Sequence, residues 1–355
     1  MVYDALIAGG GPAGASCAAF CAEAGLKVLV LEREHFPREK VCGDCLNPLC
    51  WAVLERMGTA DAVRALALSR LESVEIATLN RTLLHYPLPR HDYGEIAVKR
   101  SLLDAVLTQR ASQLGAEIRH GESITGLERT GHGWRVKTSC GVYDAKRLVA
   151  ADGRNSTVAR FLGILPAASR ERVAIQAHLP VPAGYGEKVL LCLLPEGYCG
   201  VASIGDGMIN LCLVGRPREI PALKRRSAEL GLNPCEKNEW RTVAPLSRAP
   251  LPPAGTIKDL LLVGDAARVV EPFTGEGIYY ALASGELAAA HLAGRCSVDE
   301  FVAAHHRLYA GRLWINRLAK LAVLHPRTAS SLLGLGATRF APSLLRRLTA
   351  RVVGS

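Results

Sequence analysis

The glycine-rich turn near the N-terminus, with the sequence GGGPAGASCA, constrains the fold more than any other stretch. It follows a short apolar run at residues 3–8 and precedes an alanine-rich segment at residues 12–25 that is typical of a helix. A second apolar run at residues 27–32 completes a strand–helix–strand unit. Glycines at such a turn let the backbone approach a pyrophosphate, and the helix N-terminus favours its charge. The opening therefore predicts a dinucleotide-binding fold.

Length and composition limit the remaining choices. The chain has 355 residues, 49% of them apolar and 21% charged, which indicates a globular protein of two domains or one composite domain. The net charge of +10 favours anionic partners such as phosphate-bearing cofactors or acidic lipids, and no motif indicates binding to nucleic acid. We find no signal peptide and no apolar run long enough to span a membrane, and the 11 cysteines show no disulfide framework. We therefore expect a cytoplasmic protein.

Strand and helix patterns further along the chain predict an α/β protein with a Rossmann-like nucleotide-binding domain built from separated segments. A β-rich insertion interrupts that domain, and helical patterns follow it. The expected division is a nucleotide-binding domain at residues 1–70, 95–172 and 255–295, a substrate-binding β-sheet domain at 71–94 and 173–254, and a C-terminal helical region at 296–355.

Two further motifs follow buried strands. In AADGRNSTVAR, Asp152 and Gly153 come directly after an apolar run. In LLLVGDAARVVEPFTGEGIYYALASG, Asp265 ends a strand, and a second glycine turn precedes a long helix. That turn can place backbone N–H groups against a flavin ring at a helix N-terminus. Glu32, at the end of the second strand, can accept hydrogen bonds from ribose hydroxyls.

In this order the three motifs resemble those of the FAD-dependent oxidoreductases of the p-hydroxybenzoate hydroxylase fold, and the resemblance extends from about residue 3 to about residue 293. It implies noncovalently bound FAD, with NAD(P)H as the electron donor. It places the first glycine turn and Glu32 at the pyrophosphate and adenosine ribose, Arg100 beside the FAD, and residues 274–278 over the flavin ring. The residues that it assigns to the cofactor are Gly9, Gly11, Pro12, Ala13, Gly14, Glu32, Arg33, Arg100, Asp152, Gly264, Asp265, Gly275, Gly277 and Ile278.

Within that superfamily, FPREKVCGD and EPFTGEGIYYALASGELAA look like the geranylgeranyl reductase and flavoprotein dehydrogenase branch. This branch implies reduction or dehydrogenation of a C=C bond in a hydrophobic small molecule, with hydride transfer at flavin N5. The alternative is a monooxygenase or halogenase that acts on an aromatic or polyketide-like substrate with NAD(P)H and oxygen. The reductases typically show P-x-x-Y-x-W-x-F-P, whereas this chain keeps Pro195 and Tyr198 but has Gly200 in place of the tryptophan. That departure weakens the expectation of a polyprenyl substrate, because small residues widen a pocket.

The stretch PREKVCGDCLNPLCW contains a C-x-x-C pair whose first cysteine, Cys42, matches a cysteine near the flavin in the reductase branch. Cys42 is then a proton donor or substrate contact, or else a small residue that lines the pocket. A redox pair with Cys45 is a further alternative, and we expect no metal site because a second ligand pair is missing. Lys40, Arg38 or a helix that starts near Pro48 is expected to lower the pKa of Cys42.

Two more features bear on the substrate. Tyr198 either orients a polar headgroup or donates a proton, or it is an ordinary pocket residue. The tail at residues 307–355 combines apolar residues at helical spacing with many basic residues. It predicts either peripheral contact with an anionic membrane, which suits a lipophilic substrate, or a helical layer packed on the domain with a solvated basic face.

Overall fold

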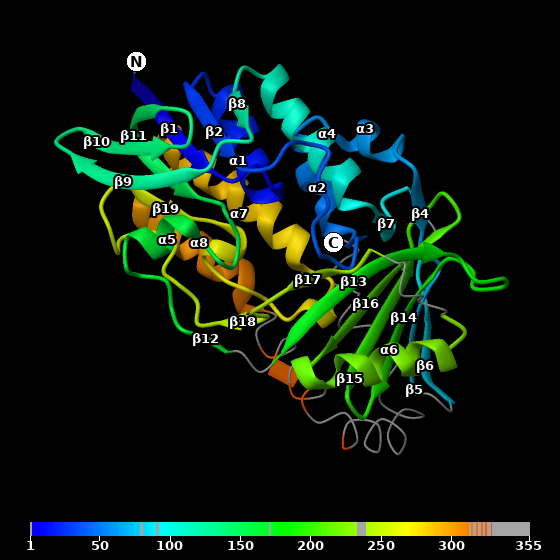
Figure 1. The fold of residues 1–355 in the computed structure, drawn as a ribbon. Helices are drawn as coiled ribbons and strands as arrows, with labels where there is room; N and C mark the ends of the chain where they lie inside the picture. The colour runs from blue at the N-terminus through cyan, green and yellow to red at the C-terminus, as the bar shows by residue number, and fades with distance from the viewer. Residues whose placement is uncertain are drawn as a thin grey trace.

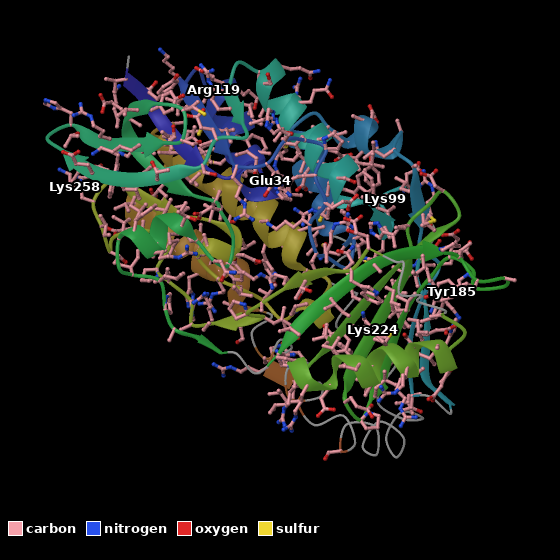
Figure 2. The ribbon with its side chains drawn as sticks, in the orientation of Figure 1. Glu34, Lys99, Arg119, Tyr185, Lys224 and Lys258 are labelled. Atoms are coloured by element: carbon pink, nitrogen blue, oxygen red, sulfur yellow. The ribbon has the colours of Figure 1, made fainter. Side chains whose placement is uncertain are left out.

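The computed structural model describes residues 2–78, 81–89, 92–169, 172–232 and 239–311, together with positions 314, 317, 318, 321, 324 and 328. Two large sheets form the two halves of the molecule (Figure 1). Polar and charged side chains lie over both halves, with Arg119 and Lys258 on the first and Tyr185 and Lys224 on the second (Figure 2). We call the half built on the sheet that contains β1 the dinucleotide half, and the half built on the sheet that contains β13 the sheet half.

The dinucleotide half is built on a seven-stranded, mainly parallel sheet with the order β8-β2-β1-β11-β10-β9, and β19 pairs with β11. Leu6 and Ile7 of β1 lie on opposite faces of this sheet, and both are buried. Both faces of the sheet are therefore covered, as is usual for parallel sheets. Helices α1, α4 and α7 cover one face. The bounds are β1 Val2–Ala8, α1 Pro12–Glu23, β2 Val28–Glu32, α4 Arg100–Gln113, β8 Glu117–His120, β9 Ile124–Thr130, β10 Gly133–Thr138, β11 Val142–Ala150, α5 Thr157–Phe161, β19 Leu260–Leu262, α7 Gly277–Leu292 and α8 Val298–Ala310.

The sheet half is a second seven-stranded sheet with the order β17-β13-β16-β15-β14-β5-β6. Leu211 and Leu213 of β16 pack beneath α6 on the outer face, whereas Val214 and Tyr198 lie on the inner face, toward the dinucleotide half. The bounds are β5 Ser73–Thr78, β6 Arg81–Pro87, β13 Val173–Pro180, β14 Lys188–Leu194, β15 Gly197–Ser203, β16 Met208–Gly215, α6 Ile220–Glu229 and β17 Arg241–Val243.

Smaller elements join the two halves. A three-stranded sheet, β3-β7-β4, lies beside helices α2 and α3, and β12 pairs with β18. Three short 3-10 helices complete the set. The bounds are β3 Cys45–Leu46, α2 Leu49–Arg56, α3 Ala60–Arg64, β4 Leu68–Arg70, β7 Ile96–Val98, β12 Ala168–Ser169, η1 Pro217–Glu219, β18 Ser247–Arg248, η2 Gly264–Ala266 and η3 Pro272–Thr274.

The fold class predicted from the sequence is confirmed, and the chain returns twice to the dinucleotide sheet after other structure, at β8 and at β19. Within the described part of the chain, none of the helices has the length and apolar composition needed to cross a bilayer. Most of the predicted helical tail at 307–355 lies outside the described residues.

Candidate active site

The glycine turn between β1 and α1 is shaped to admit a phosphate-bearing group. Gly9 has a φ of 98°, and a Cβ on it would lie 2.7 Å from the carbonyl oxygen of Ala151. A Cβ on Gly14 would lie 1.9 Å from the carbonyl oxygen of Gly9. Only glycine fits both positions, so the backbone stays open at the N-terminus of α1, where N–H groups and the helix dipole favour an anion. This cradle fits the pyrophosphate of FAD.

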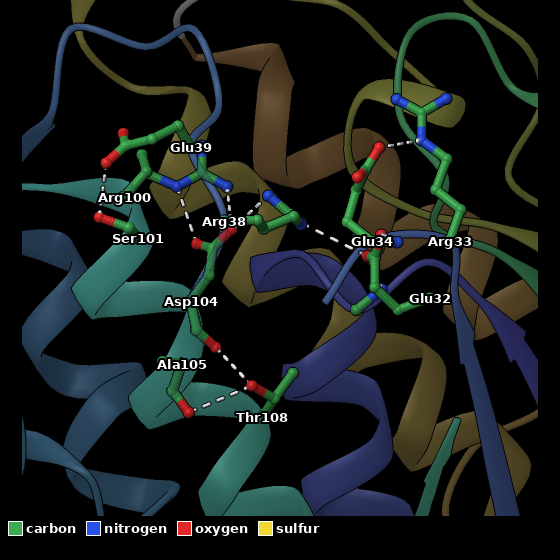
Figure 3. A network of polar contacts seen from close by, with 11 residues as sticks. Glu32, Arg33, Glu34, Arg38, Glu39, Arg100, Ser101, Asp104, Ala105 and Thr108 are labelled. Atoms are coloured by element: carbon green, nitrogen blue, oxygen red, sulfur yellow. Dashed lines mark hydrogen bonds and ion pairs between the residues drawn. The ribbon is translucent and has the colours of Figure 1, made fainter. Parts of the chain in front are cut away.

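Beside the turn lies a chain of charged side chains that links β2 to α4 (Figure 3). Glu32 ends β2, and its carboxylate accepts a hydrogen bond of 2.8 Å from the N–H of Gly10. Arg38 lies between two acids, 3.5 Å from Glu32 and 3.1 Å from Asp104. Arg100 holds Asp104 in a bidentate pair at 2.8 and 2.7 Å. The network fixes the positions of Glu32 and Arg100, both predicted cofactor residues, on either side of the turn.

Lys40 adds a cation that the sequence reasoning did not assign to the cofactor. A Cβ added at Gly11 or Gly153 would lie 4.0 or 3.6 Å from its ammonium nitrogen, which places the charge beside the glycine turn. Desolvation by surrounding protein, and then repulsion from Arg100 and Arg38, lowers the pKa of Lys40 to about 8, although the side chain keeps solvent contact. The sequence feature that could have indicated this role for Lys40 is the run PREK, because its basic residues suit contact with a phosphate as well as with a thiol.

The third motif folds against the same turn. Asp265 lies in η2 and pairs with Arg154 at 2.9 Å, and both side chains line the cavity described below. The N–H of Gly264 donates a 2.9 Å hydrogen bond to Ser284 of α7. Residues 274–278 lead into the N-terminus of the 16-residue helix α7 and also line the cavity. The helix N-terminus therefore faces a site where a flavin ring would gain from positive potential.

The cavity lining omits six of the predicted cofactor residues, which are Gly9, Gly14, Glu32, Arg33, Asp152 and Gly264. Gly9, Gly14, Glu32 and Gly264 belong to the turns and the charge network described above, whereas Arg33 and Asp152 do not. Arg33 has a side chain that is 75% exposed and pairs with Glu34 at 3.4 Å. Asp152 is partly buried, and its carboxylate accepts hydrogen bonds from the N–H groups of Thr157 and Val158 at 2.6 and 3.1 Å. Asp152 therefore satisfies the start of α5 in this structure. For both residues, a contact with the cofactor stays a prediction.

A single cavity of about 760 Å³ connects the glycine turn to the inner face of the sheet half. Gly11, Pro12 and Ala13 line one part of it. Its walls on the sheet half come from strands β5, β6, β14, β15 and β16 and are mainly apolar: Val74, Ile76, Leu191, Leu193, Val201 and Val214. A concave apolar site with few polar groups is the usual form of a small-molecule pocket. Gly200, which replaces the tryptophan of the reductase pattern, also lines it.

Cys42 lines this cavity on a loop that the sheet half holds in place. Its backbone N–H donates to Gln176 at 3.2 Å, and its carbonyl accepts from Asn210 at 2.7 Å. Two residues later, buried Asp44 adopts a φ of 59°, and its carboxylate forms a 3.0 Å hydrogen bond with Nε2 of His178. Long-range contacts of this kind, with strands more than 130 residues away, fix the loop where local sequence does not.

The prediction that the pKa of Cys42 is lowered is wrong. Burial raises the pKa of its thiol, and neighbouring Arg100 offsets only part of that increase. A helix does begin at Leu49 after Pro48, as predicted, yet burial dominates. Cys42 and Cys45 are both free thiols, and burial also raises the pKa of Cys45. A thiol of this kind stays protonated at neutral pH, which suits a proton donor better than a nucleophile.

Tyr198 of β15 faces the same cavity. In the sheet it lies opposite Leu193 and Val214, and its ring packs edge-on against Phe273 with centroids 5.3 Å apart. Burial raises its pKa well above the ordinary value, so the phenol is neutral. Phe273 belongs to η3, just before the turn at the start of α7, so Tyr198 connects the sheet wall to that turn. A direct role in proton transfer stays a prediction.

The fold and this site together define an FAD-dependent oxidoreductase. The chain belongs to the FAD binding domain family, whose profile matches residues 2–189. It has the p-hydroxybenzoate hydroxylase superfold, and it is similar to reductases of known sequence and to flavoenzymes of known structure.

Three of these similarities show their extent. Over 324 residues the chain is 30% identical to a menaquinone reductase of Mycolicibacterium smegmatis, covering 81% of this chain and 75% of that protein. It is 28% identical to digeranylgeranylglycerophospholipid reductase 1 of Methanopyrus kandleri, covering 81% and 80%. The crystallised flavin-dependent brominase Bmp2 matches with a TM-score of 0.79 and 21% identity over 100% of this chain and 94% of that one, which shows the shared fold alone.

Proposed function

We propose that this protein is a reductase that adds two electrons and two protons across a double bond of a hydrophobic small molecule. FAD, when bound, supplies the two-electron redox chemistry. NADPH or NADH is the expected source of the electrons. The observation that carries the proposal is the apolar cavity of about 760 Å³, which joins the cofactor turn to a protonated thiol on the same wall.

The protein's own groups have distinct parts in this reaction. The apolar strands of the sheet half bind the substrate and exclude water, which protects the reduced cofactor from side reactions. Cys42 donates a proton to the substrate carbon and regains it from solvent, so the thiol is unchanged after each cycle. The hydrogen bond that its N–H donates to Gln176 and the one that its carbonyl accepts from Asn210 hold its loop against the cavity.

Two relatives support a reductase. They are named reductases of menaquinone and of digeranylgeranylglycerophospholipid, and each match covers 81% of this chain. Gly200 favours a substrate that is broader than a prenyl chain, because the position that the reductase pattern fills with tryptophan is open to the cavity. A quinone-like or enone-like ring system fits such a widened pocket.

The proposal includes delivery of the substrate from a lipid surface. Trp314, Leu318 and Leu321 are exposed by 46, 52 and 54%, and Trp314 and Leu318 also line the cavity. Their spacing places them on one side of a helix. Exposed apolar side chains at the mouth of an apolar cavity, on a chain with a net charge of +10, suit contact with anionic lipid.

The decisive experiment reduces the FAD-loaded protein anaerobically and mixes it with a lipophilic enone such as chalcone, with menadione, or with oxygenated buffer. We expect rapid reoxidation by chalcone or menadione, with a product richer by two hydrogens. The oxygenated buffer also contains a phenol and bromide. A hydroxylated or brominated product of that phenol, formed only with oxygen, would instead establish the monooxygenase or halogenase alternative.

The role of Cys42 is tested in the same assay. Cys42→Ala should slow reduction of chalcone about a hundredfold, the usual contribution of a general acid, while FAD affinity stays unchanged. Cys140→Ala is the control, because Cys140 is an exposed thiol far along the chain on a turn after β10. An unchanged rate in Cys42→Ala contradicts the proton-donor role but leaves the reductase proposal standing.

A further inference from the structure

Glu95 lines the cavity among mainly apolar residues, and the neighbouring polar residue Asn47 lines it too. Glu95 directly precedes β7, and its backbone carbonyl accepts a 3.0 Å hydrogen bond from the N–H of Leu71. Strand pairing brings Val74 opposite both Tyr86 and Val189, and all three line the cavity with Glu95. The main chain of Glu95 is therefore fixed, while its side chain belongs to the pocket.

Glu95 differs from the acid at the cofactor end in having no charge partner. Asp265 pairs with Arg154 at 2.9 Å. The Glu95 carboxylate makes no ion pair or side-chain hydrogen bond with any residue that the structure describes. Burial alone raises its pKa to about 7. Its titratable neighbours are the thiols of Cys45 and Cys50, whose pKa values burial also raises, and the phenol of Tyr86 shares the wall.

A lone carboxyl in an apolar wall is costly unless it is neutral or acquires a partner. A neutral carboxyl group offers one O–H donor and one carbonyl acceptor, which complements the oxygen of a ketone, quinone or hydroxyl group. In a pocket of this kind, a few placed polar groups fix the orientation of the ligand. Among the residues that the structure describes, no cation shifts the pKa of Glu95, so nothing in the described wall favours the charged form.

We propose that Glu95 is the polar recognition point of the substrate site and holds a carbonyl oxygen of the hydrophobic substrate. This inference rests on the proposed function, because it takes the apolar cavity to be the substrate site. It narrows the substrate class to oxygenated hydrophobic molecules, such as quinones and enones, rather than pure hydrocarbon chains. Glu95 acts here in binding and orientation, whereas the proton donor of the proposed function is Cys42 on the same cavity.

The test compares binding of menadione, which carries two carbonyl groups, with binding of its carbonyl-free analogue 2-methylnaphthalene. Binding is measured by calorimetry on the FAD-loaded protein, wild type and variant. Glu95→Leu should weaken menadione about tenfold, since it removes a buried hydrogen bond, and should leave 2-methylnaphthalene unchanged. Glu95→Gln, which keeps a donor, should weaken menadione less. Glu72→Gln is the matched control, because Glu72 follows Leu71, whose N–H bonds to the carbonyl of Glu95, but is itself exposed.

The pH dependence gives a second readout. The affinity of the wild type for menadione should fall as pH rises through about 7, because ionisation removes the O–H donor. Glu95→Gln should show a flat profile. Wild-type protein that binds neither compound, or menadione binding that does not depend on Glu95, overturns the inference. If chalcone or menadione is reduced with no dependence on Glu95, the proposed reductase function stands and the inference about Glu95 fails. If menadione binds through Glu95 but is never reduced, the reductase function fails and the role of Glu95 in binding stands.

Discussion

The two halves of the molecule recognise their ligands by different means. In the dinucleotide half, charges are paired in a chain: Glu32 with Arg38, Arg38 with Asp104, and Asp104 with Arg100. In the sheet half, the cavity wall is mainly apolar, and Glu95, which lines the same cavity just before β7, makes no ion pair with any residue that the structure describes. The first half fits a cofactor with a fixed anionic group, whereas the second fits a ligand bound mainly by burial. Changes in the two halves should therefore separate FAD binding from substrate binding.

The largest effect is expected in the glycine turn. Gly14→Ala places a Cβ 1.9 Å from the carbonyl oxygen of Gly9, so the turn must open. We expect FAD affinity to fall at least a thousandfold, about 4 kcal/mol, as measured by fluorescence titration of the apoprotein. Gly131→Ala is the control, because nothing lies within 4 Å of that position. If Gly14→Ala binds FAD normally, the close approach at this turn is not what admits the cofactor.

The paired charges of the dinucleotide half give the next largest effect. Asp104→Asn leaves Arg100 and Arg38 without their shared buried carboxylate. We expect a loss of about 3 kcal/mol in the free energy of unfolding, measured with urea. Asp144→Asn breaks an exposed pair with Arg135 and should cost less than about 1 kcal/mol. Equal losses in the two variants would mean that burial adds nothing to the Asp104 network.

A change in the opposite half should leave the cofactor alone. Gly200→Trp fills part of the cavity wall with the residue that the reductase pattern has at that position. We expect menadione affinity to fall about tenfold, with FAD affinity unchanged. Gly200→Ala should have little effect on either, because the added Cβ meets Leu191 at an ordinary 3.6 Å. Loss of FAD binding in Gly200→Trp would show that the two halves are coupled.

The same division explains what the sequence could predict. The glycine turn, Glu32 and the turn before α7 are local features of strand and helix ends, and the structure has the glycine turn between β1 and α1 and the second turn before α7. From the sequence, Arg38 and Lys40 are expected to act on the nearby Cys42. Arg38 contacts Asp104, and Lys40 lies beside the glycine turn, only once the tertiary fold brings these residues together. The raised pKa of Cys42 was missed for a related reason: burial comes from strands that follow more than 130 residues later.

The smallest expected effect is a pH dependence of FAD affinity that differs from the pH dependence of menadione affinity. Lys40 lies beside the glycine turn, and its pKa is lowered to about 8, so the free protein loses this charge above pH 8. FAD affinity should then weaken roughly threefold between pH 7 and pH 9, a modest change because the side chain keeps solvent contact. Lys40→Arg should flatten this profile, since guanidinium stays charged. Lys40→Met should bind FAD weakly, with an affinity that does not change over this pH range.

Menadione affinity, in contrast, should already fall as pH rises through about 7, where Glu95 ionises. Two profiles with separate midpoints, each removed by its own substitution, indicate two independently recognised ligands. One shared midpoint that survives in Lys40→Arg would show instead that a single group governs both halves of the cavity.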